Sequence, residues 1–251
     1  MKDKPVISVI TPSLNHGSDL ENTIISFISQ DYLKKELLVI DGGSKDNTKE
    51  IIRKYQKYID YWVSEPDKGI SDAFNKGVKA AKGDYLYFMG AGDFFWSKDI
   101  LQKMMQGINP EIDILVCGRI NRIAEKGDQV LYTSGINFHK WQLLYKMGLP
   151  HQALFMNKRY FYKYGLFDIK CKFAMDYDLL LRSYKIFPAV VLKDIIVAAW
   201  REGGVGKDKT LQIYDEYKKI RLKNHIAPAM LINIIDFLSR MKYFTGKIFI
   251  G

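Results

Sequence analysis

"LLVIDGGSKDNT", residues 37–48, combines a strand, a tight loop and a helix start. Its apolar run ends at Asp41, two glycines follow, and Asn47 with Glu50 has the spacing of a helix N-terminus. A buried strand that passes through a short loop into a helix is typical of a parallel sheet with helical crossovers. A carboxylate at the tip of such a strand either forms a turn or binds a ligand, and other segments must distinguish the two.

The alternation of apolar and amphipathic segments continues on both sides of this stretch. Ser18 and Glu21 have capping-box spacing ahead of an apolar helical face, so a helix is predicted to begin at Ser18. The sequence also predicts strands at residues 6–11, 36–41, 61–64, 85–89 and 112–119, and helices from Asn47 and over 70–81 and 98–105. We therefore predict an α/β fold whose first half, residues 1–120, is Rossmann-like.

The pattern changes after residue 120. Residues 121–150 mix aromatic and polar side chains around a Lys126-Gly127-Asp128 turn, so we expect antiparallel strands there. Helices are predicted over 138–145, 176–184 and 208–223.

The segment 226–250 has two different helical faces. One face carries Met230, Ile234, Phe237 and Met241, and the other carries Asn233, Asp236, Arg240 and Lys247. The segment is therefore amphipathic rather than membrane-spanning. Three interpretations stay open, namely packing on the core, contact with a membrane surface and docking to a partner.

Composition limits the classes of function. The 251-residue chain is 47% hydrophobic and 26% charged, which predicts a folded globular protein. Its net charge of +10 predicts a polyanionic partner, which could be nucleic acid, an acidic membrane or a phosphorylated substrate. Cys117 and Cys171 lack the spacing of a zinc site or a disulfide framework, so we interpret both as buried or incidental thiols in a reducing compartment. The N-terminal MKDKPVISVI lacks a signal-peptide cleavage site, which predicts that the protein is not secreted.

Carboxylates recur where strands are expected to end. Asp41 ends the second predicted strand and Asp93 lies just beyond the fourth, so both should reach the carboxyl edge of the sheet, where open α/β folds bind ligands. Gly90, Ala91 and Gly92 would let a ligand approach the backbone before Asp93. Two acids at one edge suit a nucleotide and its metal, whereas each acid alone is more often a turn or capping residue.

A second polar cluster, Asp67, Lys68 and Asp72, lies at the start of the predicted helix 70–81, with Asn75 one turn further on. A helix start can bind ribose and phosphate oxygens through backbone donors and short polar side chains. The alternative is a well-capped surface helix.

Five segments occur in an order that resembles the inverting glycosyltransferases of family 2. They are "VISVITPSLN", "LLVIDGGSKDNT", "SEPDKGISDAFNKGVKAAKGDYLYFMGAGDFF", "PHQALFM" and "FAMDYDLLLR". The resemblance implies a GT-A fold, a single domain with a mixed, mainly parallel sheet, followed by a C-terminal amphipathic helical tail. It assigns residues 1–120 to nucleotide-sugar binding, 121–206 to acceptor binding and 207–251 to the tail. The form "SEPDKGISDAFNKG" looks like the subgroup that builds bacterial O-antigen, capsule and exopolysaccharide repeat units.

The resemblance also implies roles for the matching residues. Thr11 and Pro12 would border the nucleoside, Asp41 would bind the uracil edge, and Lys68 with Asp72 would lie along the ribose and diphosphate. The full set of implied nucleotide-sugar contacts is Thr11, Pro12, Asn15, Asp41, Gly43, Ser44, Lys68, Asp72, Gly92, Asp93, His151, Gln152 and Arg201.

Asp93 would be the ligand of a Mn²⁺ or Mg²⁺ ion. The sequence departs from the family pattern here, because Ala91-Gly92-Asp93 stands where an aspartate-x-aspartate triplet is expected. A single carboxylate can still bind a metal that a diphosphate already chelates, so we expect weak metal affinity without the donor.

Asp176 matches the general base of the family. An inverting transfer needs one carboxylate to take the proton of the attacking hydroxyl, and the alternative for Asp176 is a helix N-cap. Asp178 is assigned to structure or acceptor contacts. His151 and Gln152 would border the donor sugar or the acceptor, and Trp200 and Arg201, followed by EGGVG, would belong to a mobile loop that closes over the diphosphate.

The resemblance thus implies a metal-dependent enzyme that transfers a hexose, glucose or galactose as a first assignment, from a UDP-sugar. The implied acceptor is a saccharide linked to polyprenyl diphosphate, and the implied location is the cytoplasmic face of the membrane, which fits the positive charge and the amphipathic tail. Two other functions stay open. A nucleotidyltransferase would need a glycine-rich loop with a basic residue early in the chain, which residues 11–15 lack. A nucleic-acid-binding protein would gather its basic residues, whereas "KDNTKEIIRKYQK" mixes them with acids, so we expect no nucleic acid.

Overall fold

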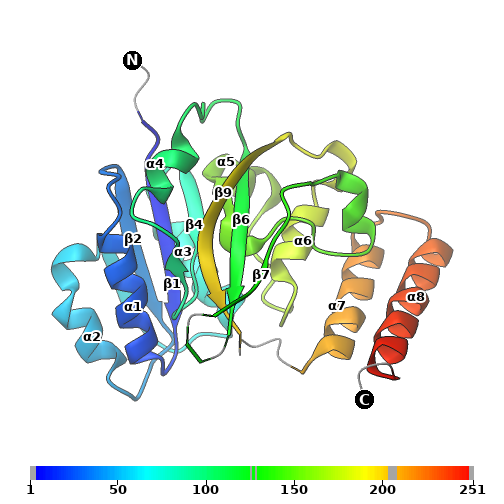
Figure 1. The fold of residues 1–251 in the computed structure, drawn as a ribbon, viewed down its shortest axis with the longest axis horizontal. Coiled ribbons are helices and arrows are strands. Elements are labelled where there is room, and N and C mark those ends of the chain that lie inside the picture. Colours follow the sequence, from blue (N-terminus) through cyan, green and yellow to red (C-terminus); the bar gives the residue numbers. More distant parts are fainter. Residues whose placement is uncertain (1–3, 125, 128, 203–207, 249–251) are drawn as a thin grey trace.

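The centre of the molecule is a curved β-sheet, and the computed structural model describes residues 4–124, 126–127, 129–202 and 208–248 (Figure 1). The described residues form one nine-stranded sheet with the order β3-β2-β1-β4-β8-β6-β9-β5, and β7 pairs with β6. The strands are β1 (Ile7–Ser13), β2 (Lys35–Asp41), β3 (Tyr61–Ser64), β4 (Tyr85–Phe88), β5 (Phe94–Phe95), β6 (Leu115–Ile123), β7 (Val130–Thr133), β8 (Leu154–Asn157) and β9 (Val190–Arg201).

Helices cover the sheet and extend it at one end. The α-helices are α1 (Gly17–Ile28), α2 (Thr48–Lys54), α3 (Ile70–Ala80), α4 (Ile100–Met105), α5 (Lys158–Tyr164), α6 (Met175–Leu181), α7 (Thr210–Lys223) and α8 (Ala229–Ile248). Short 3₁₀ helices are η1 (Gln56–Tyr58), η2 (Lys140–Leu144), η3 (His151–Ala153) and η4 (Tyr184–Ile186). Figure 1 shows α1 and α2 at one end of the molecule and the pair α7 and α8 at the other.

The first four strands form the parallel part of the sheet, as the sequence predicts. β1 pairs in parallel with β2 and β4, and β2 pairs in parallel with β3. The register aligns Ser13 with Asp41 and Asp41 with Ser64, so three polar residues lie side by side where these strands end.

The remaining strands make the sheet mixed. β8 runs antiparallel to both β4 and β6, while β9 runs parallel to β6 and antiparallel to β5. Because β8 reverses the direction twice, the carboxyl ends of β1 to β4, β6 and β9 lie at one edge, the lower edge in Figure 1. We call this the carboxyl edge.

The core follows the apolar strands. Tyr85, Leu86, Tyr87 and Phe88 of β4 are all buried, because β1 and β8 flank the strand and helices cover its faces. The prediction of a central strand buried on both faces is therefore confirmed. Cys117 and Cys171 are buried free thiols.

The predicted capping box at Ser18 is wrong. Helix α1 begins at Gly17, and its N-cap position, His16, makes no side-chain cap. The Gly17 N–H instead donates to Asp46 Oδ2 at 3.1 Å, so the loop before α2 satisfies the start of α1. Glu21 pairs with Lys54 Nζ of α2 at 2.6 Å, which explains why it does not close a capping box. The predicted start of α2 after Asn47 is confirmed.

Several boundaries in the second half differ from the prediction. The strand expected at 112–119 lies at Leu115–Ile123, and the helix expected at 138–145 is only the 3₁₀ helix η2. The expected antiparallel pairing after residue 120 is present as β7 against β6. Trp200 and Arg201 do not lie in a loop, because they are the last residues of the long strand β9. The rest of that proposed loop, residues 203–207, lies outside the described residues.

The C-terminal helices are present as predicted. α7 covers most of the predicted segment 208–223, and α8 follows as a twenty-residue helix packed beside α7. Among the described residues, no helix has the length and apolar character that crossing a bilayer requires.

Candidate active site at the carboxyl edge

The loops after β1 and β2 are tied together. The Gly42 N–H donates to the Ser13 carbonyl at 2.9 Å, and the Asn15 N–H donates to Ser44 Oγ at 2.8 Å. Asn15 Oδ1 accepts from the Lys45 N–H at 2.8 Å, and Asn15 itself has a φ of 57°. Asparagine tolerates this left-handed conformation better than most residues. The predicted contact residues Asn15 and Ser44 therefore belong to one rigid double loop.

Asp41 lies at the centre of this double loop. Its carboxylate is fully buried and accepts hydrogen bonds from the Ser44 N–H at 3.2 Å and from the hydroxyls of Ser44 and Ser64. Gly43, between these residues, has a φ of 87°, which favours glycine. The protein itself thus supplies three donors to Asp41, which is the arrangement of a turn-forming aspartate.

Two hydroxyls on β1 lack such partners. Thr11 is fully buried and Ser13 is nearly so, yet within the described residues neither hydroxyl oxygen has a hydrogen-bond partner. A buried hydroxyl left unpaired costs about 1–3 kcal/mol. These two groups, on either side of Pro12, are therefore available to a ligand or to water.

Two aspartates hold the loop that leads into α3. Asp72 Oδ2 accepts from the Lys68 N–H at 3.1 Å, and Asp67 Oδ1 accepts from the Gly69 N–H at 2.8 Å. A β-carbon on Gly42 would lie 2.5 Å from Asp67 Oδ2, so only glycine lets the α3 start approach the β2 loop this closely. Lys68 is exposed above this junction.

The loop between β4 and β5 holds Asp93 in place through a residue of α1. Thr23 Oγ1 donates to the Asp93 carbonyl at 2.8 Å and accepts from the Gly92 N–H at 3.0 Å. Gly92 has a φ of 95°. Asp93 Oδ2 accepts from the Gly90 N–H at 3.2 Å, and the side chain is only 7% exposed. Thr23, which the sequence analysis did not single out, is the residue that fixes this loop.

Asp93 is electrostatically different from Asp41. Burial raises the pKa of Asp93 to about 7, although backbone donors of Arg201 and Gly90 and the Arg201 charge lower it. A nearby divalent cation would offset this desolvation, and a hard carboxylate oxygen is a suitable ligand for Mn²⁺ or Mg²⁺. A second acid, Asp19 of α1, lies near the same loop, because a β-carbon on Gly92 would be 3.9 Å from Asp19 Oδ1. The residues present therefore fit a divalent cation.

The Arg201 side chain contacts the connection between β6 and β7. Its Nη1 donates to the carbonyls of Ala124 at 3.1 Å and Gly127 at 2.5 Å, in the connection between β6 and β7. The β5–β9 pairing of Phe94 with Ala199 brings the Arg201 backbone beside Asp93. The residue is therefore close to Asp93, as the resemblance implies, but it lies on a strand.

Asp176 and His151 meet at the edge of an aromatic cluster. Asp176 Oδ2 lies 4.0 Å from His151 Nδ1, and the Asp176 side chain is 22% exposed. Asp176 Oδ1 accepts from the Tyr177 N–H at 2.8 Å. Helix α6 begins at Met175 with Ala174 as its N-cap, so the N-cap interpretation of Asp176 is wrong.

His151 is partly buried, and both of its ring nitrogens are shielded from solvent. Its ring stacks on Phe88 at 5.4 Å between ring centroids and contacts Phe74 and Phe167, and within the described residues neither ring nitrogen has a hydrogen-bond partner. Burial lowers the pKa of His151, and the charge of Asp176 raises it in part. Nδ1 of the ring therefore faces the Asp176 carboxylate without a hydrogen bond.

Two contacts bring these segments to the same edge. Ser71, in the first turn of α3, donates to the Cys171 carbonyl at 3.2 Å and lies 2.9 Å from Met175 Sδ, so the starts of α3 and α6 adjoin. The Gln152 carbonyl accepts from the hydroxyl of Tyr87 on β4 at 2.6 Å. The structure therefore gathers the predicted residues of both halves around one edge.

Asp178, two residues after Asp176, is structural. Its fully buried carboxylate accepts from Arg182 Nη2 at 2.5 Å, Lys223 Nζ at 3.0 Å and Asn224 Nδ2 at 3.1 Å. Asp168, Cys171 and Asp178 lie close enough to one another to hold a metal ion. However, the Lys223 ammonium also pairs with Asp168 at 2.7 Å and already supplies the cation there.

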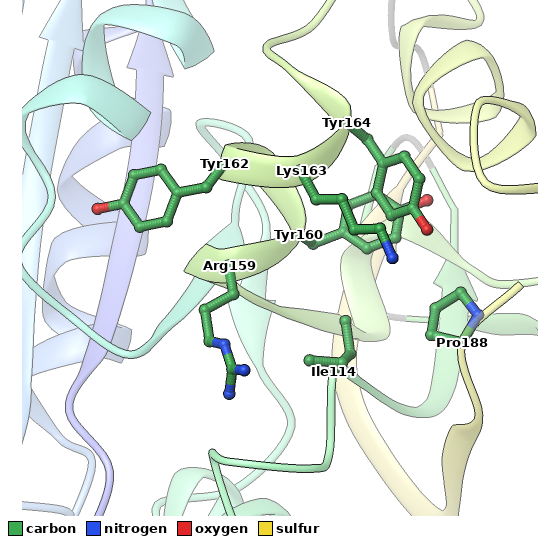
Figure 2. A pocket seen from close by; sticks show the side chains of 7 residues that line it. All are labelled: Ile114, Arg159, Tyr160, Tyr162, Lys163, Tyr164 and Pro188. Atoms are coloured by element: carbon green, nitrogen blue, oxygen red, sulfur yellow. The ribbon is translucent and has the colours of Figure 1, made fainter. Parts of the chain in front are cut away.

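A hollow lies away from these residues. It has a volume of about 510 Å³ and lies on α5 beside Ile114 and Pro188, which precede β6 and β9, so it opens at the opposite edge of the sheet (Figure 2). Its lining includes Arg159, which donates to the Glu111 carbonyl at 2.9 Å, and contains no carboxylate. We therefore assign the chemistry to the carboxyl edge.

Comparison with known proteins gives a family match. The family model described as "Glycosyl transferase family 2" matches residues 8–178. An uncharacterized glycosyltransferase of Mycobacterium tuberculosis is 30% identical over 213 residues, which cover 83% of this chain and 80% of the relative. A PGL/p-HBAD biosynthesis glycosyltransferase of Mycobacterium bovis is 27% identical over 237 residues, which cover 92% of this chain and 90% of the relative.

Solved structures share the fold. S. aureus TarS 1–349 has a TM-score of 0.71 at 19% identity, covering 95% of this chain and 72% of TarS 1–349. The mannosyltransferase PcManGT from Pyrobaculum calidifontis, solved with GDP-Man and Mn²⁺, has a TM-score of 0.68 at 15% identity, covering 96% and 70%. The predicted GT-A fold is confirmed.

Proposed function

The chain belongs to glycosyltransferase family 2, and on that premise we propose that it transfers a hexose from a UDP-sugar, with inversion, to a saccharide linked to polyprenyl diphosphate. The observation that carries the proposal is the presence at one sheet edge of two carboxylates, the buried Asp93, which has backbone donors alone, and the partly exposed Asp176. S. aureus TarS was solved in complex with UDP and with UDP-GlcNAc, which supports a UDP-sugar as the donor.

The donor nucleotide would lie over the double loop of β1 and β2. Asp41 would bind the uracil edge through the acceptor capacity that its three internal donors leave free. The unpaired hydroxyls of Thr11 and Ser13 would find partners there. Exposed Lys68 would offset the diphosphate charge, and His151 with Gln152 would border the sugar.

Asp93 would hold the Mn²⁺ or Mg²⁺ ion. Such an ion stabilises the negative charge of the departing diphosphate. Neutralising Asp93 by a cation removes the cost of burying its charge, so the buried carboxylate supports metal binding in the presence of the donor.

Asp176 would act as general base. The acceptor hydroxyl oxygen attacks the anomeric carbon opposite the UDP group and forms the new glycosidic bond. The old bond to the diphosphate oxygen breaks, and its electron pair leaves with UDP. The hydroxyl proton would pass to the Asp176 carboxylate, which the Tyr177 N–H holds through Oδ1 at 2.8 Å.

We place the enzyme at the cytoplasmic face of the membrane, where a polyprenyl-linked acceptor would be available. The net charge of +10 supports contact with anionic lipid. Family membership favours sugar transfer over nucleotidyl transfer and over nucleic-acid binding.

A donor screen tests the proposal. The purified chain would be mixed with UDP-glucose, UDP-galactose or UDP-GlcNAc, Mn²⁺, and lipid-diphosphate-linked GlcNAc or GalNAc, and UDP release would be measured. We expect release that requires both acceptor and metal and stops in EDTA. Calorimetry with UDP and CTP provides a second readout, and a preference for CTP would support a nucleotidyltransferase.

A further inference from the structure

Helix α8 has an inverted polarity. Its large apolar side chains face away from α7 and are between 41% and 76% exposed; they are Met230, Leu231, Ile234, Phe237, Leu238, Met241 and Phe244. Its one acidic side chain faces inward, because Asp236 is buried and pairs with Arg240 Nε at 3.0 Å and with Lys218 Nζ of α7 at 3.7 Å. A surface helix normally has the opposite arrangement.

Ion pairs fix this orientation. Arg240 Nη2 also pairs with Asp215 of α7 at 2.7 Å, and Ile232 is fully buried on the same side. Turning the helix to bury its apolar side chains would break its two ion pairs with α7, Arg240 with Asp215 and Asp236 with Lys218. The exposed apolar side chains therefore form a permanent outer surface of the folded protein, which we call the α8 outer face.

The charges on α8 indicate what covers this face. Asp236 is the only acidic residue of the helix and it points inward, whereas Lys242 is exposed. The face repeats every four and three residues, as in a coiled coil. However, Arg240, which would flank the seam with a second copy, is already paired with Asp215 and Asp236 of its own chain and is not available to pair across that seam. Two copies, each with a net charge of +10, would also repel each other.

We propose that the α8 outer face inserts into the surface of a bilayer that contains anionic lipids. The apolar stripe from residue 230 to residue 244 is about 21 Å long at the 1.5 Å rise of an α-helix. A helix with such a stripe lies in the interfacial plane with its apolar side chains about 5–10 Å into the boundary of the acyl chains. Insertion of this face would bring the enzyme to a lipid-linked acceptor. The proposal rests on the proposed function only in that respect.

Vesicle flotation tests the insertion without donor or acceptor. The full chain would be mixed with vesicles of phosphatidylcholine containing one quarter phosphatidylglycerol, or of phosphatidylcholine alone. We expect binding to the anionic vesicles, and we expect the double variant Phe237→Ser/Phe244→Ser to bind them roughly tenfold more weakly or worse, because two inserted aromatic side chains are lost. Leu33→Ser/Ile112→Ser, at two other exposed apolar sites, is the matched control and should bind like the parent.

Three results would overturn the insertion. The first is equal binding by the Phe237→Ser/Phe244→Ser variant and the parent, and the second is no binding by the parent. The third is a parent dimer, seen by light scattering, that the double variant converts to a monomer without any effect on vesicles, which would assign the face to a second copy. Sugar transfer to a water-soluble acceptor should be unchanged in the variant, so loss of flotation is separable from failure of the proposed activity.

Discussion

Asp41 and Asp93 both follow strands that flank β1, and both are buried at the same edge, yet their surroundings differ. Asp41 accepts hydrogen bonds from Ser44 and Ser64, which hold it as part of a rigid turn. Asp93 has backbone donors alone, and its pKa is raised to about 7. His151 resembles Asp93 in this respect, since its ring nitrogens lack partners within the described residues.

The contrast separates a preformed half of the edge from an unfinished half. Most polar groups in the loops after β1 and β2 already have hydrogen-bond partners within the protein, and the hydroxyls of Thr11 and Ser13 are the exceptions among the described residues. Ligand binding there therefore needs little rearrangement. Around Asp93 and His151 the fold leaves a cost of desolvation in place, which the binding of metal or substrate can offset. Active sites commonly concentrate such perturbed groups.

The largest effect is expected at Asp176. Asp176→Asn keeps the size of the side chain but removes the base, so turnover should fall about a thousandfold. UDP release at saturating donor and acceptor measures this. Turnover near that of the parent would remove Asp176 from the role of base.

Asp178→Asn, two residues away, is the control. It should lower stability, whereas Asp176→Asn should lower turnover. Asp178→Asn leaves Arg182 and Lys223 without their buried partner, so the free energy of unfolding should fall by about 3 kcal/mol. Urea denaturation of the two variants compares them directly. A stable Asp178→Asn protein with lost turnover would shift the catalytic role from Asp176 to Asp178.

Asp93 should make the metal-free protein less stable as pH rises. Its folded pKa of about 7 exceeds the unfolded value of about 3.9, so between these values only the folded state keeps the proton. The free energy of unfolding should therefore fall across pH 4 to 7, by at most about 4 kcal/mol from this group.

Asp93→Asn should remove that dependence and make the protein more stable than the parent at pH 8, while abolishing metal-dependent transfer. Denaturation in EDTA at pH 4.5 and pH 8 measures the difference. If the free energy of unfolding changes with pH in the same way in both proteins, Asp93 does not have the raised pKa that this prediction assumes.

The smallest effects are expected at Asp41. Asp41→Ala should weaken UDP binding about tenfold and lower the free energy of unfolding by about 1–3 kcal/mol, because the donors of Ser44 and Ser64 lose their acceptor. Ser64→Ala removes one donor only and should leave UDP affinity close to that of the parent. Calorimetry with UDP compares them, and unchanged affinity in Asp41→Ala would leave Asp41 a turn residue alone.

The sequence predicts the first half of the fold well for a physical reason. Segments such as residues 37–48 carry their own strand, turn and helix signals, and parallel strands with short crossovers need little information from distant residues. The second half depends on long-range pairing. Strand β9 pairs with β6, and the paired residues Leu115 and Val190 lie 75 residues apart in the sequence. The local sequence pattern did not predict this strand. Arg201 was consequently interpreted as part of a loop.

The candidate site was predictable in its residue types but not in its internal contacts. Strand-end carboxylates and the resemblance identify Asp41, Asp93 and Asp176. Ser64 and Thr23, which hold the first two, come from other elements and have no motif of their own. The burial of Asp236 likewise depends on its contact with Lys218 of α7, and the periodicity of α8 alone does not show which face of the helix packs against α7.

The position of β8 beside β4 has a consequence for synthesis of the chain. The parallel strands β1 to β4 are complete at Phe88, but β4 gains its second neighbour only when Asn157 is available. At ribosomal rates of about 5–20 residues per second, the unpaired edge of β4 would wait roughly 3 to 14 s for that partner. Nascent chains that stop before β8 should therefore aggregate and recruit chaperones, whereas chains that extend past it should not.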